Sequence, residues 1–357
     1  MTAPLEALRN DPTAWDEFVE STPTGAYPQL SGWAEVKRHN GWRAGRVVVD
    51  GSRGPIGLQL LVRDLRPTPW RIGYAPRGPV AACFDAAGVG RLTDALRDVG
   101  RRERLVEILV DPEIEPGDAL DGHLAAAGWR PVPAIQADRT RLVDLRRPEE
   151  ELWGDLRSKW RQYVAKARRA GVTIEDAGAA GLDEFYRIYV ETARRAGFIH
   201  RAQRAYDDVF AAFDANGRAR LLLARLADGT PAAALLLLTC DGRVIEPYGG
   251  MTEAGAASRA NYLLKWEAIR SSRERGFATY DMWGVAHPGI ERFKSGFGGR
   301  EVRYAGGRTL VLDQVGHLAI GLARRAAVTV ARARHGIRGG GPAGSSAAGI
   351  GAGGDAT

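Results

Sequence analysis

The chain has 357 residues, of which 45% are hydrophobic and 26% are charged. This length exceeds the ~100–200 residues usual for one domain, and this composition excludes disorder over most of the chain, so we expect two compact units. The net charge of +7 and the pI near 9.6 favour a polyanionic partner such as tRNA, a nucleotide phosphate or anionic lipid, although a basic surface that serves only solubility has the same balance.

The first half of the chain alternates strand-like and helix-like segments. A short strand precedes a helical run, an apolar strand follows, and a second helix leads through Gly128-Trp129 into a further strand. The predicted segments are Arg71–Ala75, Gly90–Arg102, Leu105–Asp111 and Ala119–Ala127.

Two helices are expected next. Leu152–Arg169 carries apolar residues at helical spacing on one face and basic residues on the other, which predicts one basic amphipathic helix ending at Gly171. Its basic face is interpreted either as an RNA-binding surface or as an ordinary solvated face. The run Asp183–Ala196 predicts a second helix that stops at Gly197.

The second half repeats the order of the first. Its predicted segments are Arg243–Tyr248, Asn261–Arg275, Phe277–Trp283, Gly289–Ser295 and Glu301–Tyr304. Aligning Gly128-Trp129 with Gly296-Phe297 gives an offset of 168 residues, and such an echo marks duplicated architecture. We therefore predict an α/β protein with two tandem units of mixed sheets flanked by helices.

The predicted boundaries follow from this echo. The first unit is expected over residues 1–148 and the second over 149–312. A basic amphipathic helix from about Gln314 to His335 fills 313–336 and is interpreted as packing on its own domain or resting on an anionic membrane surface. The Gly-rich stretch 337–357 is expected to be disordered.

Several common sites are missing from the sequence. It contains no GxSxG, Walker or HExxH motif, and its six histidines are scattered. Cys83 and Cys240 have no ligand spacing, so neither a disulfide framework nor a metal site is expected. The N-terminus lacks the features of a signal peptide and no apolar run is long enough to span a membrane, which predicts a cytoplasmic protein.

Only five of the 50 basic residues are lysines. In a chain so rich in arginine, a lysine hints that a compact point charge is preferred at its position, although a single codon change also explains any one of them. They are Lys37, Lys159, Lys166, Lys265 and Lys294.

The strand and helix order invites comparison with acetyl-CoA-dependent acetyltransferases, whose diphosphate loop is a Q/R-x-x-G-x-G/A turn that opens a helix. The nearest match, Asp85–Gly90, begins with a carboxylate that would repel a diphosphate. The corresponding stretch of the second half, Met251–Asn261, has no such loop. A duplicated acetyltransferase-like fold without a CoA loop is the resulting interpretation.

Further segments stand out in order along the chain. They are YPQLSGWAEVKRHNGW (Tyr27–Trp42), AIQADRTRLVDL (Ala134–Leu145), LRSKWRQYVAKARRAGV (Leu156–Val172), ETARRAGFIHR (Glu191–Arg201) and a C-terminal run that includes GIERFKSGFGG (Gly289–Gly299). Together they resemble the signatures of the FemABX family of peptidoglycan aminoacyltransferases, of the lipid II:glycine glycyltransferase type. The resemblance covers roughly residues 25–310.

The resemblance implies a pair of acetyltransferase-like (GNAT-like) subdomains whose donor is an aminoacyl-tRNA. The interval from Gly197 to Arg220 has no room for the long helical arm of some members, so the chain resembles the compact ones. The implied reaction moves Gly, Ala or Ser to the stem-peptide amino group of a peptidoglycan precursor. The implied acceptor is UDP-MurNAc-pentapeptide or lipid II, and the last helix makes peripheral contact with the inner membrane surface a further hypothesis.

The resemblance also assigns roles to single residues. Lys37, in a WxxxK pattern, would bind the acceptor's diphosphate. Phe293 would stack on the terminal adenine of the tRNA, and Lys294 would face the ester carbonyl as it becomes an oxyanion. Asp281 is expected either to anchor a loop or to orient the attacking amine. Further candidate substrate-binding residues are Arg195, Arg201, Tyr206 and Tyr248.

The implied chemistry asks little of acid–base side chains. An amino acid ester is already activated, and a deprotonated amine attacks it once both are positioned, so no metal or organic cofactor is expected. Two alternatives stay open from the residues: an acyl-CoA-dependent or tRNA-dependent N-acyltransferase acting on another amine, such as a secondary metabolite, and a non-catalytic module that binds RNA or anionic membrane through its basic helices.

Overall fold

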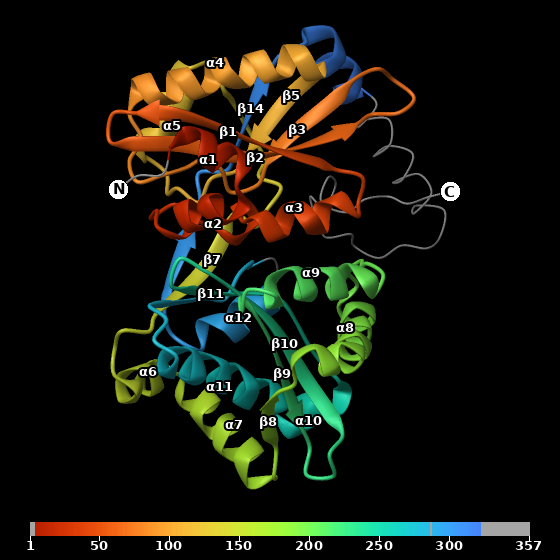
Figure 1. Cartoon of the computed structure of the whole chain (residues 1–357). Coiled ribbons are helices and arrows are strands. Elements are labelled where there is room, and N and C mark those ends of the chain that lie inside the picture. The colour runs from red at the N-terminus through yellow and green to blue at the C-terminus, as the bar shows by residue number, and fades with distance from the viewer. Residues whose placement is uncertain (1–3, 286–287, 323–357) are drawn as a thin grey trace. The chain divides into compact units, whose positions relative to one another are not determined.

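The computed structural model describes residues 4–285 and 288–322 (Figure 1). The chain divides into two compact units. The first comprises Lys37–Gln136 and the described parts of Met1–Thr24 and Ala305–Thr357; the second comprises Gly25–Val36 and Ala137–Tyr304. Each unit is built around one seven-stranded mixed sheet with helices against it, which confirms the predicted fold class.

The first unit has the strand order β1-β2-β3-β5-β14-β6, with β4 paired to β2. Only β3 and β5 are parallel, because helix α4 connects them. The elements are α1 (Leu5–Asn10), α2 (Pro12–Glu20), β1 (Arg43–Gly51), β2 (Gly54–Asp64), β3 (Arg71–Ala75), β4 (Val80–Ala81), α4 (Ala86–Glu103), β5 (Leu105–Val110), α5 (Ala119–Ala126), β6 (Arg130–Val132) and β14 (Gly307–Val311).

Helix α4 covers the first sheet and begins at an acidic cap. Leu92 and Leu96 pack with Ile108 of β5 in the core. Asp85 accepts hydrogen bonds from the backbone N–H of Gly88 at 2.8 Å and of Ser52 at 2.9 Å. These bonds lower the pKa of the Asp85 carboxyl to about 2. The nearest match to a CoA loop is therefore a carboxylate-capped helix N-terminus.

The second unit has the strand order β13-β7-β12-β11-β10-β9-β8. Its one parallel pair, β11 and β12, is again connected through a helix, α11. The elements are η1 (Tyr27–Gln29), α3 (Ser31–Arg38), β7 (Arg139–Asp144), α6 (Glu149–Asp155), α7 (Ser158–Arg169), β8 (Thr173–Asp176), η2 (Gly178–Gly181), α8 (Leu182–Ala196), α9 (Arg204–Asp214), β9 (Ala219–Arg225), β10 (Pro231–Cys240), β11 (Arg243–Met251), α10 (Glu253–Ser258), α11 (Ala260–Glu274), β12 (Thr279–Asp281), α12 (Pro288–Ser295) and β13 (Arg300–Arg303).

The predicted echo is present, and it includes an exchange of strands. In the first sheet, β14 lies between β5 and β6; in the second, β7 occupies the matching position between β12 and β13. The strand that follows β6 along the chain thus completes the second sheet, and the strand that follows β13 completes the first. The units therefore differ from the predicted blocks 1–148 and 149–312, because strand pairing joins residues far apart in sequence.

A segment near the N-terminus also belongs to the second unit. The Tyr27 ring meets the rings of Trp33 at 5.4 Å, Trp283 at 5.5 Å and Phe213 at 5.9 Å. Burial of these aromatic side chains holds the predicted N-terminal signature against the second sheet.

The predicted basic helix Leu152–Arg169 is in fact two helices, α6 and α7. Leu156 and Arg157 have extended backbones, with ψ near 135° and 139°. The backbone N–H of Arg157 donates to the carbonyl of Gly296 at 2.9 Å instead of continuing a helix. This long-range bond explains the break, which periodicity does not reveal. The second predicted helix does end at Gly197, which has a left-handed φ of 74°.

The end of the chain is described only in part. Residues 314–322 are helical, at the start of the predicted helix, and hydrogen-bond to the first unit. The remainder of that helix and the stretch 337–357 lie outside the described residues. No helix within 4–285 or 288–322 is long and apolar enough to cross a membrane.

Replacing Gly255 of α10 by alanine is expected to destabilise the second unit. The new Cβ would collide with the backbone carbonyl of Ala232 in β10, which predicts a loss of roughly 2–4 kcal/mol in the free energy of unfolding. Gly122→Ala in α5 is the matched control, because its Cβ meets open space and should stabilise by up to ~1 kcal/mol. Urea denaturation of both variants measures the difference; equal midpoints would contradict the collision.

Candidate functional site

The second sheet opens between its two parallel strands. β11 and β12 pair over three residues each, ending at the pair Ile245 and Asp281. Beyond that pair β11 continues on β10, but its register shifts at Glu246-Pro247. A proline is tolerated at a bulge because the extra residue there donates no backbone hydrogen bond to the neighbouring strand. Sites in open α/β sheets form beyond the carboxyl ends of strands that part in this way, so the candidate site is sought here.

A buried lysine pairs with the glutamate of the bulge. Lys265 of α11 is 1% exposed, and its Nζ forms an ion pair with Oε2 of Glu246. The Tyr280 hydroxyl donates to the same oxygen at 2.6 Å. Burial lowers the pKa of Lys265, opposed by the Glu246 charge; burial and Glu246 together raise the pKa of Tyr280 well above its usual value. A compensated cation therefore lies in the core at the bulge.

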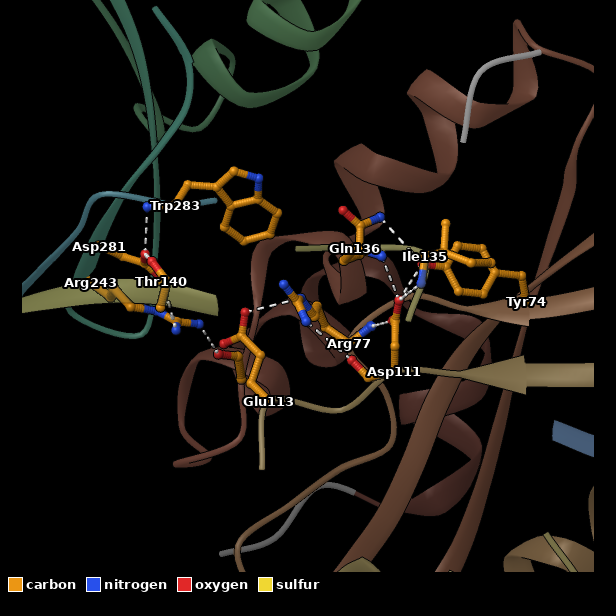
Figure 2. A network of polar contacts seen from close by, with 11 residues as sticks. Tyr74, Arg77, Asp111, Glu113, Ile135, Gln136, Thr140, Arg243, Asp281 and Trp283 are labelled. Atoms are coloured by element: carbon orange, nitrogen blue, oxygen red, sulfur yellow. Dashed lines mark hydrogen bonds and ion pairs between the residues drawn. The ribbon is translucent and has the colours of Figure 1, made fainter. Parts of the chain in front are cut away.

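Asp281 holds the chain that follows β12 (Figure 2). Its Oδ1 accepts hydrogen bonds from the Thr140 hydroxyl and from the backbone N–H of Trp283, the latter at 2.8 Å. The Arg243 guanidinium lies 3.5 Å from its Oδ2. Trp283 has a left-handed φ of 50°, a conformation that the hydrogen bond to Asp281 helps to maintain. Asp281 thus makes the contacts of a loop anchor.

Lys294 of α12 binds the same loop. Its Nζ donates to the carbonyls of Met282 at 2.6 Å and of Gly284 at 2.8 Å, and also to that of Trp283. Burial lowers the pKa of Lys294 to about 8, although the charge of Glu246 opposes the shift. All three ammonium protons are engaged, so Lys294 reaches a substrate oxygen only by exchanging one of these carbonyls.

Phe293 lies in an aromatic group between α7, α11 and α12. Its ring meets those of Tyr262 and Phe297, each at 5.2 Å and nearly edge to face. The Trp160 indole N–H donates to the Phe293 carbonyl at 3.0 Å. Helix α7, the second part of the basic segment, therefore fixes the position of α12 and with it that of Lys294.

A second group of aromatic side chains joins α8, α9 and β11. The rings of Tyr206 and Tyr248 meet at 5.2 Å and 89°, and Tyr189 lies 5.1 Å from Tyr206. Burial raises the pKa of all three phenols. The backbone N–H of Arg201 donates to the Tyr206 hydroxyl at 3.1 Å, and Phe198, which touches Tyr189, is 37% exposed. The group thus reaches from the core to the surface.

The other predicted binding residues are placed differently. Arg195 is partly exposed and donates to the Met251 carbonyl at 2.8 Å. Lys37 lies in the last turn of α3, is 9% exposed and is grouped with the first unit. Its burial is unlike that of an ordinary surface lysine.

The first unit contains a counterpart of Asp281 (Figure 2). Asp111 follows β5 as Asp281 ends β12. It accepts hydrogen bonds from the Tyr74 hydroxyl at 2.9 Å and from the backbone N–H groups of Arg77 at 2.9 Å and Gln136 at 2.8 Å. Each unit therefore anchors a loop through a buried aspartate at the end of the equivalent strand, β5 in the first unit and β12 in the second.

Two sequence models of known families match the chain. The FemAB family matches residues 11–119, and an acetyltransferase (GNAT) domain matches residues 154–295. Proteins named lipid II:glycine glycyltransferase are 29% identical over 223 residues in Staphylococcus aureus (strain MRSA252) and 28% identical over 223 residues in Staphylococcus haemolyticus (strain JCSC1435). The first part of the chain thus resembles the FemAB family, and the second part resembles an acetyltransferase domain. Each of these alignments covers 59% of the chain and 53% of the relative, so the chain matches about half the length of those relatives.

Solved structures show the fold of this chain. The crystal structure of FemX has a TM-score of 0.80 at 21% identity and covers 87% of this chain and 98% of FemX. A tandem GNAT protein from the clavulanic acid biosynthesis pathway has a TM-score of 0.53 at 14% identity, and the match covers 85% of this chain and 96% of that protein. The predicted pair of acetyltransferase-like subdomains is confirmed.

The structure groups most of the candidate residues in two places of the second unit. Asp281, Phe293 and Lys294 gather around the loop after β12, while Tyr206 and Tyr248 form the aromatic group between α8, α9 and β11. Sequence reasoning singled out Lys265 only as one of the five lysines, without a role, and it missed Glu246. The scarcity of lysine was a signal for Lys265, but nothing in the sequence indicated its partner.

Replacing Lys265 by methionine should strongly destabilise the second unit. The variant leaves the Glu246 carboxylate buried without its cation, which costs about 3–5 kcal/mol of unfolding free energy. The double variant Lys265→Met/Glu246→Gln should recover part of this loss, because no uncompensated charge remains. Chemical denaturation of both singles and the double gives the coupling energy. Additive losses would mean that the two residues do not act as a pair.

Proposed function

We propose that the chain transfers an amino acid, with glycine as the first candidate, from aminoacyl-tRNA to the stem-peptide amino group of a peptidoglycan precursor. The names of the relatives support an acyl transfer that builds the interpeptide bridge. The observation that carries the proposal is the cationic Lys294 at the loop beyond the separated strands β11 and β12, beside the aromatic group of Phe293.

The proposed reaction needs two positioned substrates and little proton chemistry. The acceptor amine nitrogen forms a bond to the carbonyl carbon of the aminoacyl ester, and the bond from that carbon to the ribose oxygen breaks. The amine loses a proton, and the released ribose hydroxyl gains one. Because the ester is activated, most of the acceleration comes from placement and from stabilising the oxyanion, and the reaction needs no metal or organic cofactor.

Lys294 is assigned to the oxyanion. As the ester carbonyl approaches, the ammonium exchanges one of its backbone carbonyl partners for the substrate oxygen, in an environment where the low dielectric strengthens the interaction. Asp281 keeps the loop in place during this exchange, through its bond to Trp283. Phe293 offers an aromatic face on which the terminal adenine of the tRNA stacks. Such stacking is not specific for one base.

The acceptor is assigned to the tyrosine group and its neighbours. Tyr206 and Tyr248 combine apolar rings with hydroxyl groups, which suits a peptide stem. Arg201 and Arg195 supply guanidinium groups beside it for the diphosphate of UDP-MurNAc-pentapeptide or lipid II. Lys37 is a further candidate for binding a phosphate, which suits its compact ammonium group.

A second candidate function is an acyl-CoA-dependent N-acyltransferase acting on another amine. The match of an acetyltransferase (GNAT) domain to residues 154–295 favours it. The segments that would hold a CoA diphosphate argue against it. In the first unit Asp85 caps α4, and in the second the stretch after β11 forms helix α10, capped by the hydroxyl of Thr252.

The donor and the acceptor can be identified in one assay. Purified protein is incubated with tRNA charged with labelled glycine, alanine or serine and with either UDP-MurNAc-pentapeptide or lipid II, and the product mass is measured. We expect one added residue, glycine first, on the stem peptide, and no competition by CoA. Transfer from acetyl-CoA, with none from any charged tRNA, would favour the second candidate and sink the proposal.

Lys294→Met is expected to lower the transfer rate by about 10²–10³-fold with the KM for the acceptor little changed, because one oxyanion partner is lost. Lys294→Arg keeps a cation and serves as the conservative control. Since the pKa of Lys294 is lowered to about 8, the charged form is lost above that pH, and the wild-type rate should fall there.

In Lys294→Arg this fall should move to higher pH, because a guanidinium stays protonated. Circular dichroism establishes that each variant is folded. A folded Lys294→Met protein with an unchanged rate and pH profile would remove Lys294 from the mechanism.

A further inference from the structure

The helical residues 314–322 present an exposed apolar face. Val315, Leu318 and Leu322 are 71%, 65% and 66% exposed. Their spacing of three and four residues places them on one side of the helix. They are three of the six large hydrophobic side chains that are exposed in the described part of the chain, so this face is a concentrated patch and not the scattered exposure of an ordinary surface.

The opposite side of this helix is fixed to the first unit. Gly316 is buried beside Val106 of β5. The His317 Nδ1 lies 2.7 Å from Oε2 of the buried Glu107, also in β5. Asp313 caps the first turn by accepting from the backbone N–H of Val315 at 2.9 Å. The apolar face is therefore held outward by contacts to the core of the unit.

A groove rich in arginine adjoins this helix. A cavity of about 550 Å³ is lined by Trp70, Arg101, Arg104 and, just before the helix, Asp313. A second cavity of about 470 Å³ shares Trp70 and Arg104 with the first. The arginines lining the two are Arg66, Arg71, Arg97, Arg101, Arg102 and Arg104, against two aspartates.

Part of this positive charge is available to a partner. The Arg66 side chain is 88% exposed, although its guanidinium lies 3.8 Å from the Asp64 carboxylate. Arg102 and Arg104 form no ion pair with any residue in 4–285 or 288–322. Arg71, Arg97 and Arg101 pair with nearby carboxylates.

We propose that the apolar face of residues 314–322 and the arginine groove form one docking surface for an anionic lipid bilayer. Exposed leucine and valine side chains enter the boundary between headgroups and acyl chains, arginines meet the lipid phosphates, and Trp70 has the amphipathic ring typical of that boundary. RNA would account for the arginines but not for the apolar face. The surface goes beyond the proposed transfer reaction, because it concerns where the first unit is held and not which bond is made.

The test is co-sedimentation of the purified full-length chain with vesicles, without any substrate of the transfer reaction. One set contains phosphatidylcholine alone, and the other contains equal parts of phosphatidylcholine and phosphatidylglycerol. We expect binding to the anionic vesicles that weakens as salt is raised. Leu318→Asp and the double variant Arg102→Glu/Arg104→Glu should each weaken that binding by about tenfold or more.

Matched controls separate this surface from general charge and apolarity. Arg53→Glu reverses an exposed arginine on the turn between β1 and β2, and Ile199→Asp replaces a side chain that is 92% exposed in the second unit. Both should bind anionic vesicles like the parent. Circular dichroism and sedimentation velocity verify the fold and the oligomeric state of every variant.

Three outcomes would overturn the proposal. The first is the absence of binding to anionic vesicles, as expected if other residues of the chain cover the face. The second is binding that responds to Arg102→Glu/Arg104→Glu but not to Leu318→Asp and that tRNA abolishes, which would make the groove an RNA site. The third is a parent oligomer that Leu318→Asp dissociates, which would make the face an interface between two copies.

Discussion

The short parallel contact between β11 and β12 determines the architecture of the second unit. The two strands pair over three residues each, and the bulge at Glu246-Pro247 then takes β11 away. After β12 the backbone N–H groups of Met282 and Val285 still donate to β7, but β11 no longer runs beside the chain, so other backbone groups of this loop rely on side-chain anchors. Asp281 accepts one backbone N–H, and Lys294 donates to three consecutive carbonyls. The cation assigned to the oxyanion is thus also a structural part of the loop that it would serve.

Buried charge is the cost of this arrangement, and the packing around it offsets that cost. Lys265 is almost fully buried, and its partner Glu246 also accepts a hydrogen bond from Tyr280. Such pairs stabilise a fold little by themselves but penalise any structure that separates them. The Glu246 and Asp281 charges also oppose the loss of the proton from Lys294, whose pKa burial lowers. The two carboxylates therefore help to keep the buried Lys294 side chain charged, a role that water plays for an exposed lysine.

Duplication explains why similar anchors occur in both units. Asp111 after β5 and Asp281 at the end of β12 each accept backbone N–H groups from the following or neighbouring loop. The exchange of β7 and β14 then joins the two sheets through the chain itself, because each sheet is completed by a strand that follows the other unit's last segment. The conformations of the loops anchored by Asp111 and Asp281 are therefore restricted by the pairing of the strands that precede them.

The sequence by itself determined the local elements, because periodicity, caps and the echo at 168 residues depend on neighbours along the chain. It also singled out Asp281, Lys294 and the scarce lysines as positions of special chemistry. The tertiary structure alone decided the strand exchange, the break at Leu156 and the Lys265–Glu246 pair. These depend on hydrogen bonds and charges between residues far apart in sequence, and the free energy of burying them is set by the folded surroundings, which no local pattern contains.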